Sequence, residues 1–220
     1  MNLEELEKNG LCGLVFDCDG VMIDSADANR RFYALALGAL GLPPMRKDQE
    51  KFAFQATAKQ ALLSMVPEEL HDKIDETVRD KVDYIRDVLP HIRLMPGFEE
   101  FIDFAHKKGF RLAIDTNRTR EGIMRVLDFF ALPPYFDQII CSSNSEPKPS
   151  PDGAEKICKA WSAPPKTVLF VGDSENDRKT AVGAGTVFAA FGNRELRGDL
   201  EVPDFAAFGQ MLQNVPALRC

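Results

Sequence analysis

The second half of this chain alternates between short apolar segments and amphipathic segments, and this alternation constrains the fold more than any other feature. From Pro96 onward, runs rich in β-branched and aromatic residues, such as Phe110–Asp115, are followed by helical patterns, such as Thr119–Phe130. Strands that alternate with helices form βαβ crossovers, which place the strands in a parallel sheet. The sequence therefore predicts an α/β fold. The expected strands are 11–16, 110–115, 138–141, 167–171 and 186–191, and the expected core helices are 98–108, 119–130, 152–161, 176–184 and 204–212.

The segment between the first strand and the alternating region has a different pattern. Ala26–Gly41, Lys51–Met65 and Pro67–Leu89 carry charged residues interleaved with apolar residues at helical spacing, and none of them reads as a strand. Proline is well suited to the start of a helix, as at Pro67. We therefore predict a helical domain at 25–92, inserted as a lid into an α/β core formed by 1–24 and 93–220.

Length and charge limit the classes of partner. The 220 residues are 45% hydrophobic, enough to bury a substantial core. The net charge of −7 provides no general positive field for nucleic acid or anionic lipid. No apolar run approaches the roughly 20 residues needed to span a bilayer, and the first nine residues are acidic rather than signal-like. These features predict a cytoplasmic protein without nucleic-acid or membrane partners.

The cysteines give no sign of a disulfide framework. Five cysteines are scattered along the chain, an odd number without the paired spacing of a metal site. We expect them to be reduced thiols, most of them buried packing residues, and we expect the last residues of the chain to be frayed. The five are Cys12, Cys18, Cys141, Cys158 and Cys220.

Two carboxylates follow the first expected strand directly. Asp17 and Asp19 come after the apolar run, and Gly20 then lets the backbone turn. In open α/β sheets, ligands bind outside the carboxyl ends of the strands. Asp and Gly are also common turn residues, so this pair alone fits a plain turn about equally well.

Polar residues also follow two later strands. Thr116 and Asn117 stand at the end of a strand and before a helix whose first amides could bind an anion, although an ordinary helix cap would look the same. Lys148 lies between two prolines, which restrain the backbone and leave the side chain able to reach over a pocket. A solvated surface lysine is the alternative reading of Lys148.

A fourth strand end adds Asp173 and Asp177. Hard oxygen ligands of this type suit Mg²⁺, which usually binds one or two carboxylates together with substrate phosphate oxygens. If Asp173 and Asp177 only stabilised the start of the following helix, they would not indicate a metal site. Together with Asp17, Asp19 and Lys148, however, they place four acids and one lysine at the same edge of the expected sheet. Chance explains this arrangement poorly.

These groups, in this order, resemble the four motifs of the haloacid dehalogenase superfamily. The helical insertion between the first and second motifs is similar to the type-one cap of its phosphoglycolate phosphatase and beta-phosphoglucomutase branch. The resemblance spans nearly the whole chain and implies a Rossmann-like parallel sheet sandwiched by helices, with a helical cap. The residues that carry it are Phe16–Val21, Thr116-Asn117, Lys148-Pro149, Gly172–Asp177, Met95–Phe98 and Ala184-Gly185.

The resemblance implies a role for each motif residue. Asp17 would be the nucleophile that forms an aspartyl phosphate. Asp19 would protonate the leaving group and afterwards deprotonate the attacking water. Thr116 and Lys148 would bind the transferring phosphate oxygens, with Asn117 beside them in the substrate site.

The resemblance also implies a Mg²⁺ ion as cofactor. Its ligands would be the carboxylate of Asp17, the backbone carbonyl of Asp19 and the carboxylate of Asp173. Asp177 would hold metal-bound waters or Lys148 rather than the ion itself.

The expected activity is that of a phosphoric monoester hydrolase acting on a small phosphorylated metabolite, in a monomer or homodimer. Lys59 and Arg118 are the best candidates to meet a substrate carboxylate or second phosphate, with helix-surface solvation as the alternative for each. A phosphosugar mutase remains an alternative, although Gly172 occupies the position where beta-phosphoglucomutase relatives typically have a Glu. A catalytically idle regulatory module is a further alternative. Asp19 argues against haloacid dehalogenase chemistry, because those relatives lack this acid.

Overall fold

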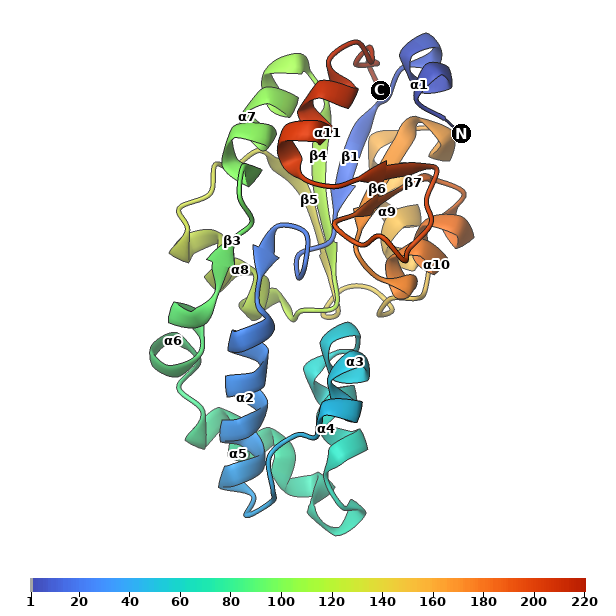
Figure 1. The fold of residues 1–220 in the computed structure, drawn as a ribbon. Coiled ribbons are helices and arrows are strands. Elements are labelled where there is room, and N and C mark those ends of the chain that lie inside the picture. Colours follow the sequence, from blue (N-terminus) through green and yellow to red (C-terminus); the bar gives the residue numbers. More distant parts are fainter. Residues whose placement is uncertain (1) are drawn as a thin grey trace. The chain divides into compact units, whose positions relative to one another are not determined.

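The computed structural model describes residues 2–220, and a six-stranded sheet forms the centre of the larger of its two compact units (Figure 1). Every neighbouring pair of its strands is parallel, in the order β5-β4-β1-β6-β7-β8. The predicted α/β fold is confirmed, while the short edge strand β8 was not predicted. The strands are β1 (Gly13–Phe16), β4 (Arg111–Thr116), β5 (Phe136–Cys141), β6 (Val168–Gly172), β7 (Val187–Phe191) and β8 (Leu200–Val202).

Strand β1 lies inside the sheet and is buried on both faces. Its four residues are fully buried, as expected for a parallel strand covered by helices on each side. Val15 belongs to a buried cluster that includes Ile157 and Trp161. Phe16 points to the opposite face, where its ring centroid lies 5.9 Å from that of Phe98. The core therefore continues through the strand that immediately precedes Asp17.

Helices cover the two faces of the sheet in two pairs (Figure 1). On one face, α7 (Phe98–Lys108) packs against α11 (Phe205–Leu212), with the rings of Phe101 and Phe208 stacked at 4.6 Å. On the other face, α9 (Asp152–Trp161) packs beside α10 (Glu175–Ala184). Two more helices, α1 (Leu3–Asn9) and α8 (Arg120–Phe129), precede β1 and follow β4. None of the helices in residues 2–220 has the length and apolar character needed to cross a bilayer.

The chain divides into two compact units. The first consists of the chain up to Met22 together with Leu94–Cys220, and the second consists of Ile23–Arg93. Two short strands, β2 (Ile23–Asp24) and β3 (Arg93–Leu94), pair where the chain passes from one unit to the other. The second unit is otherwise helical. Its helices are α2 (Ala26–Ala39), α3 (Lys47–Gln55), α4 (Ala58–Met65), η1 (Glu68–Lys73), α5 (Ile74–Lys81), α6 (Tyr84–Asp87) and η2 (Leu89–His91).

The segment Pro67–Leu89, predicted to be helical, is divided into several short helices. The backbone of Val82 is extended, with φ −110° and ψ 103°, and this ends α5. The side chain of Asp83 then accepts a hydrogen bond from the backbone N–H of Arg86, which caps a new helix. Because Asp competes for backbone donors more effectively at a helix start than in its interior, a local cap overrides the continuous apolar pattern.

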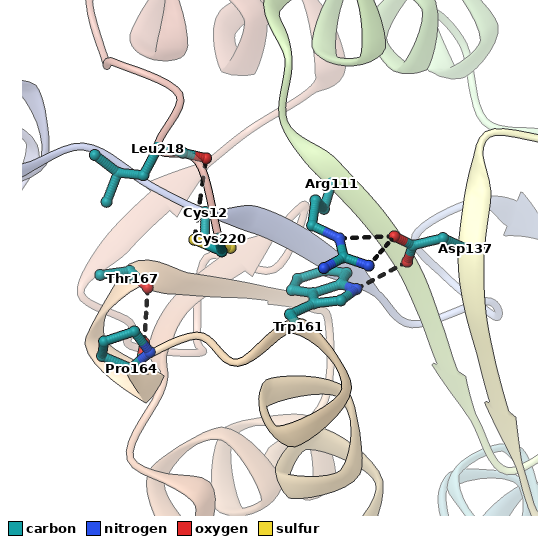
Figure 2. The surroundings of a disulfide bond; sticks show 8 residues. All are labelled: Cys12, Arg111, Asp137, Trp161, Pro164, Thr167, Leu218 and Cys220. Atoms are coloured by element: carbon teal, nitrogen blue, oxygen red, sulfur yellow. Dashed lines mark hydrogen bonds and ion pairs between the residues drawn. A yellow bond between two sulfur atoms is a disulfide. The ribbon is translucent and has the colours of Figure 1, made fainter.

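The C-terminal tail is docked, so the prediction of a frayed end is wrong. The N–H of Leu11 donates to the carbonyl of Pro216, and the N–H of Leu218 donates to the carbonyl of Leu11. This pairing brings Cys220 to Cys12, which lies just before β1, and the two form a disulfide with Cα atoms 5.9 Å apart (Figure 2). The expectation of reduced thiols is therefore wrong for these two cysteines. Cys18, Cys141 and Cys158 are free and buried, as predicted.

Candidate active site

The carboxyl ends of three adjacent strands carry the polar residues of the candidate site. Phe16 of β1 is aligned with Ile114 of β4 on one side and with Val171 of β6 on the other. The residues that follow these positions therefore leave the sheet at one edge, as the sequence predicted. The lysine of the loop after β5 reaches the same edge, because Lys148 Nζ lies 2.6 Å from Asp17 Oδ1.

Lys148 forms a buried ion triad with two carboxylates. Its ammonium group also lies 2.6 Å from Asp177 Oδ1, and 7% or less of each of the three residues is exposed. Burial lowers the pKa of Lys148, but the carboxylates of Asp17 and Asp177 outweigh that effect and raise it above the usual lysine value. A raised pKa favours the protonated lysine at neutral pH, and its burial excludes the alternative of a solvated surface lysine.

Asp173 brings a third carboxylate to the triad. Carboxylate oxygens of Asp17, Asp173 and Asp177 all lie within 4.8 Å of one another. Burial and the neighbouring carboxylate of Asp177 raise the pKa of Asp173 to about 7, and the same two causes raise the pKa of Asp17 well above its ordinary value. With all three carboxylates ionised, as a bound cation would favour, this group and the ammonium carry a net charge of −2. A compact set of hard oxygen donors with excess negative charge fits Mg²⁺.

Gly20 makes the approach of Asp173 possible. Its φ of +82° lies in the left-handed region, and a Cβ atom at this position would lie 2.1 Å from Asp173 Oδ2. The turn predicted after Asp19 is therefore also a point of close contact between the first and fourth motifs. Any side chain at position 20 would displace a carboxylate of the cluster.

Ser174 holds Asp177 in place, a contact that the sequence reasoning did not identify. The backbone N–H and the hydroxyl of Ser174 donate to Asp177 Oδ2, at 3.1 and 2.5 Å, and Ser174 Oγ accepts from the N–H of Asp177. This reciprocal capping box starts α10. The spacing of a serine three residues before an acid was the available signal. Asp177 Oδ1 remains directed at Lys148.

Thr116 and Asn117 lie at the same edge with different surroundings. Thr116 is buried, and its hydroxyl accepts a hydrogen bond of 3.2 Å from the backbone N–H of Arg118. The amide of Asn117 pairs with the backbone of Lys148, donating to its carbonyl at 3.1 Å and accepting from its N–H at 2.8 Å. In this structure the Asn117 side chain therefore fixes the loop that carries the lysine.

The two cations proposed from the sequence to meet substrate each have a carboxylate partner. Arg118 contacts both carboxylate oxygens of Asp19, with Nε donating to Oδ2 at 2.7 Å and a terminal nitrogen donating to Oδ1 at 2.6 Å. Lys59, in the helical unit, forms an exposed ion pair of 2.7 Å with Asp75. Arg118 is thus joined to a motif residue, a pairing between positions 99 residues apart in the chain.

Asp115 is a further acid at this edge that the sequence reasoning did not single out. Only 3% of the residue is exposed, and its Oδ2 has no hydrogen-bond partner within residues 2–220. Burial raises the pKa of Asp115 to about 6, although Lys148 acts in the opposite direction. Asp115 lies within β4, and the strand pattern of the sequence does not show whether its side chain is buried or exposed. The sequence therefore gave no signal for this acid.

Asp115→Asn is expected to stabilise the protein at neutral pH and not at acid pH. A native pKa of about 6 against an ordinary 3.8 means that the folded chain retains this proton longer than the unfolded chain, so this group's contribution to stability declines as pH rises from 3.8 to 6. At pH 7.5 the ionised Asp115 lowers the free energy of unfolding by about 3 kcal/mol. An uncharged amide at this position avoids this cost, although burying the amide has a smaller cost of its own. Urea unfolding in EDTA at pH 4 and pH 7.5 measures the difference. Equal effects at both pH values would contradict this account, and Asp128→Asn, on an exposed position, is the control.

Comparison with known proteins supplies independent findings. A family model described as haloacid dehalogenase-like hydrolase matches residues 14–191. A phosphoglycolate phosphatase of Aquifex aeolicus is 27% identical over 87% of this chain and 90% of its own length. Another from Cereibacter sphaeroides is 30% identical over 81% of this chain and 84% of its own. A HAD-superfamily hydrolase of subfamily IA from Geobacter sulfurreducens has a similar structure, with a TM-score of 0.73 and 29% identity over 93% of this chain and 98% of its own.

Proposed function

Because the chain belongs to the haloacid dehalogenase-like hydrolase family, we propose that it is a Mg²⁺-dependent phosphatase of small phosphorylated metabolites that works through an aspartyl phosphate. The observation that carries the proposal is the buried ion triad of Asp17, Lys148 and Asp177 beside Asp173. The similarity to proteins named phosphoglycolate phosphatase supports the same reaction class. We assign the helical unit, Ile23–Arg93, the role of a cap that selects the substrate.

Asp17 is the proposed nucleophile. Its Oδ1 accepts hydrogen bonds from the N–H of Cys18 and from Lys148, both at 2.6 Å, and these contacts fix the orientation of the carboxylate. The carboxylate attacks phosphorus, an O–P bond forms, and the bond from phosphorus to the leaving oxygen breaks. Asp19 gives a proton to that oxygen. Water then attacks phosphorus, returns a proton to Asp19, and releases inorganic phosphate from Asp17.

The remaining residues hold charge in place. Lys148, which stays protonated, neutralises part of the negative charge that develops on the phosphoryl oxygens, together with the hydroxyl of Thr116. Asp17, Asp173 and the backbone carbonyl of Asp19 are the proposed ligands of Mg²⁺. When bound, this ion supplies the positive charge that lets several acids and a phosphate dianion occupy one site. The contacts of Asp177 with Ser174 and Lys148 favour a positioning role for that residue.

Gly172 favours hydrolysis over mutase chemistry. A Cβ atom at this position would lie 2.3 Å from the Cβ of Asp177, so the site as built leaves no room for a side chain there. Relatives of the phosphosugar mutase type typically have a Glu at this position. A Glu there would require Asp177 and its contact with Lys148 to be rearranged.

The test is release of inorganic phosphate from a panel of phosphorylated metabolites, with Mg²⁺ and with EDTA. We expect Mg²⁺-dependent release from at least one small ester and none in EDTA. Incubation with a hexose 1-phosphate and the matching bisphosphate separates the two enzyme classes, because a hydrolase produces free phosphate and a mutase produces the isomeric hexose phosphate. Inactivity over the whole panel would instead favour a catalytically idle module.

A further inference from the structure

The contact between Arg118 and Asp19 joins the proposed proton carrier to a cation that the proposed reaction does not use. Both carboxylate oxygens of Asp19 accept from the same guanidinium, at 2.7 and 2.6 Å. The exposed fractions of the Arg118 and Asp19 side chains are 12% and 24%, so much of this contact is shielded from water. Two parallel charge-assisted hydrogen bonds of this kind are strong and geometrically specific.

The backbone of Arg118 is fixed, so the guanidinium is presented from a rigid point. Its N–H donates to Thr116 Oγ1 at 3.2 Å, and its carbonyl accepts from the N–H and the hydroxyl of Ser142, both at 3.0 Å. Arg118 thus stands two residues from a proposed phosphate-binding hydroxyl. A group that replaced Asp19 on this guanidinium would lie close to the bound ester.

We propose that Arg118 determines specificity by exchanging Asp19 for a second anionic group on the substrate. This inference rests on the proposed phosphatase function and concerns the leaving group. While Asp19 is held by Arg118, its carboxylate is directed at the guanidinium. An anion on the leaving group takes over the guanidinium and releases Asp19 toward the ester oxygen.

The cost of separating the pair makes the exchange selective. A shielded guanidinium that loses its carboxylate without a replacement is a poorly compensated charge. The fork of an arginine matches the oxygens of a carboxylate or a phosphate equally well. An ester that carries either anion frees Asp19 and replaces its carboxylate on Arg118, whereas an uncharged alkyl phosphate can free Asp19 only by removing this carboxylate from Arg118 without replacing it.

Binding of phosphonates, which cannot be hydrolysed, tests the exchange separately from turnover. Titration calorimetry with Mg²⁺ compares 3-phosphonopropanoate with 3-hydroxypropylphosphonate, which differ in the presence of a carboxylate. We expect the unmodified protein to prefer the carboxylate roughly 10- to 100-fold, the range expected of charged hydrogen bonds. Arg118→Gln should remove this preference, and Arg118→Lys should keep part of it. Arg120→Gln, an exposed arginine two positions further on, is the matched control and should retain the preference.

Several outcomes would overturn the exchange. One is equal affinity of the unmodified protein for the two phosphonates. Another is an equal loss of affinity for both phosphonates in Arg118→Gln, which would indicate a purely structural contact. Ethane-1,2-diphosphonate carries a second phosphonate in place of the carboxylate, and the anion that loses more affinity in Arg118→Gln identifies the preferred group. Failure to hydrolyse any phosphate ester would refute the proposed function, while the binding preference would still decide the role of Arg118.

Discussion

Asp17→Asn is expected to lower kcat by a factor on the order of 10⁴ to 10⁶, the range seen when a covalent catalytic group is removed. The amide has nearly the same shape as the carboxylate but cannot attack phosphorus to form an acyl phosphate. Phosphate release from the best ester of the metabolite panel, measured with Mg²⁺, gives the effect directly.

The fold should survive this substitution. Burial and Asp177 raise the pKa of Asp17 well above its ordinary value in the protein without a bound cation, so the ionised side chain is itself costly there. Circular dichroism and the urea midpoint in EDTA should therefore match or exceed those of the unmodified protein. Asp128→Asn, at an exposed position on α8, should change neither property. Turnover above one tenth of the original in Asp17→Asn would refute the nucleophile assignment.

Lys148→Met is expected to abolish turnover and also to destabilise the fold, by about 3 to 5 kcal/mol. Methionine fills a similar volume, but it leaves the buried carboxylates of Asp17 and Asp177 without the ammonium that lies 2.6 Å from each. The free energy of unfolding, from urea titration in EDTA at pH 7.5, should fall accordingly. Phosphate release should disappear because the cation facing the phosphoryl oxygens is gone.

A second substitution distinguishes lost charge balance from lost packing. Lys148→Met combined with Asp177→Asn removes one of the two unpaired charges, so part of the stability should return, while activity should not. Lys107→Met breaks only an exposed pair with Asp103 and should leave stability and turnover nearly unchanged. If the double variant were as unstable as the sum of its single variants, the coupling between Lys148 and Asp177 would be refuted.

Much of the core could be predicted because its signals are local. Alternating strand and helix patterns require a parallel sheet, and parallel strands bring their carboxyl ends to one edge. This reasoning predicts that Asp17, Lys148, Asp173 and Asp177 lie together, and the structure brings these four side chains into contact or close approach. The family resemblance stated from the four motifs is confirmed.

The failures of prediction concern contacts between distant positions. The pairing of Arg118 with Asp19 joins residues 99 positions apart, and the sequence around neither residue predicts it. The burial of Asp115, whose Oδ2 has no hydrogen-bond partner among residues 2–220, depends on helices packed against β4 and produces no periodic pattern in the sequence. Within the helical unit, a single extended residue, Val82, divides a segment that has a continuous amphipathic pattern. Tertiary contacts and local capping decided these features, and propensity did not.

The disulfide between Cys12 and Cys220 makes the covalent chain almost a closed ring. The two residues are 208 positions apart, so nearly every peptide bond of the protein lies inside the loop that the disulfide closes. A single protease cut anywhere in that loop, including one in Ile23–Arg93, opens the ring without separating the pieces. Such a nicked molecule migrates as two fragments only after the disulfide is reduced. If the cut lies between Asp17 and Lys148, the members of the ion triad are on different fragments, which the disulfide still joins.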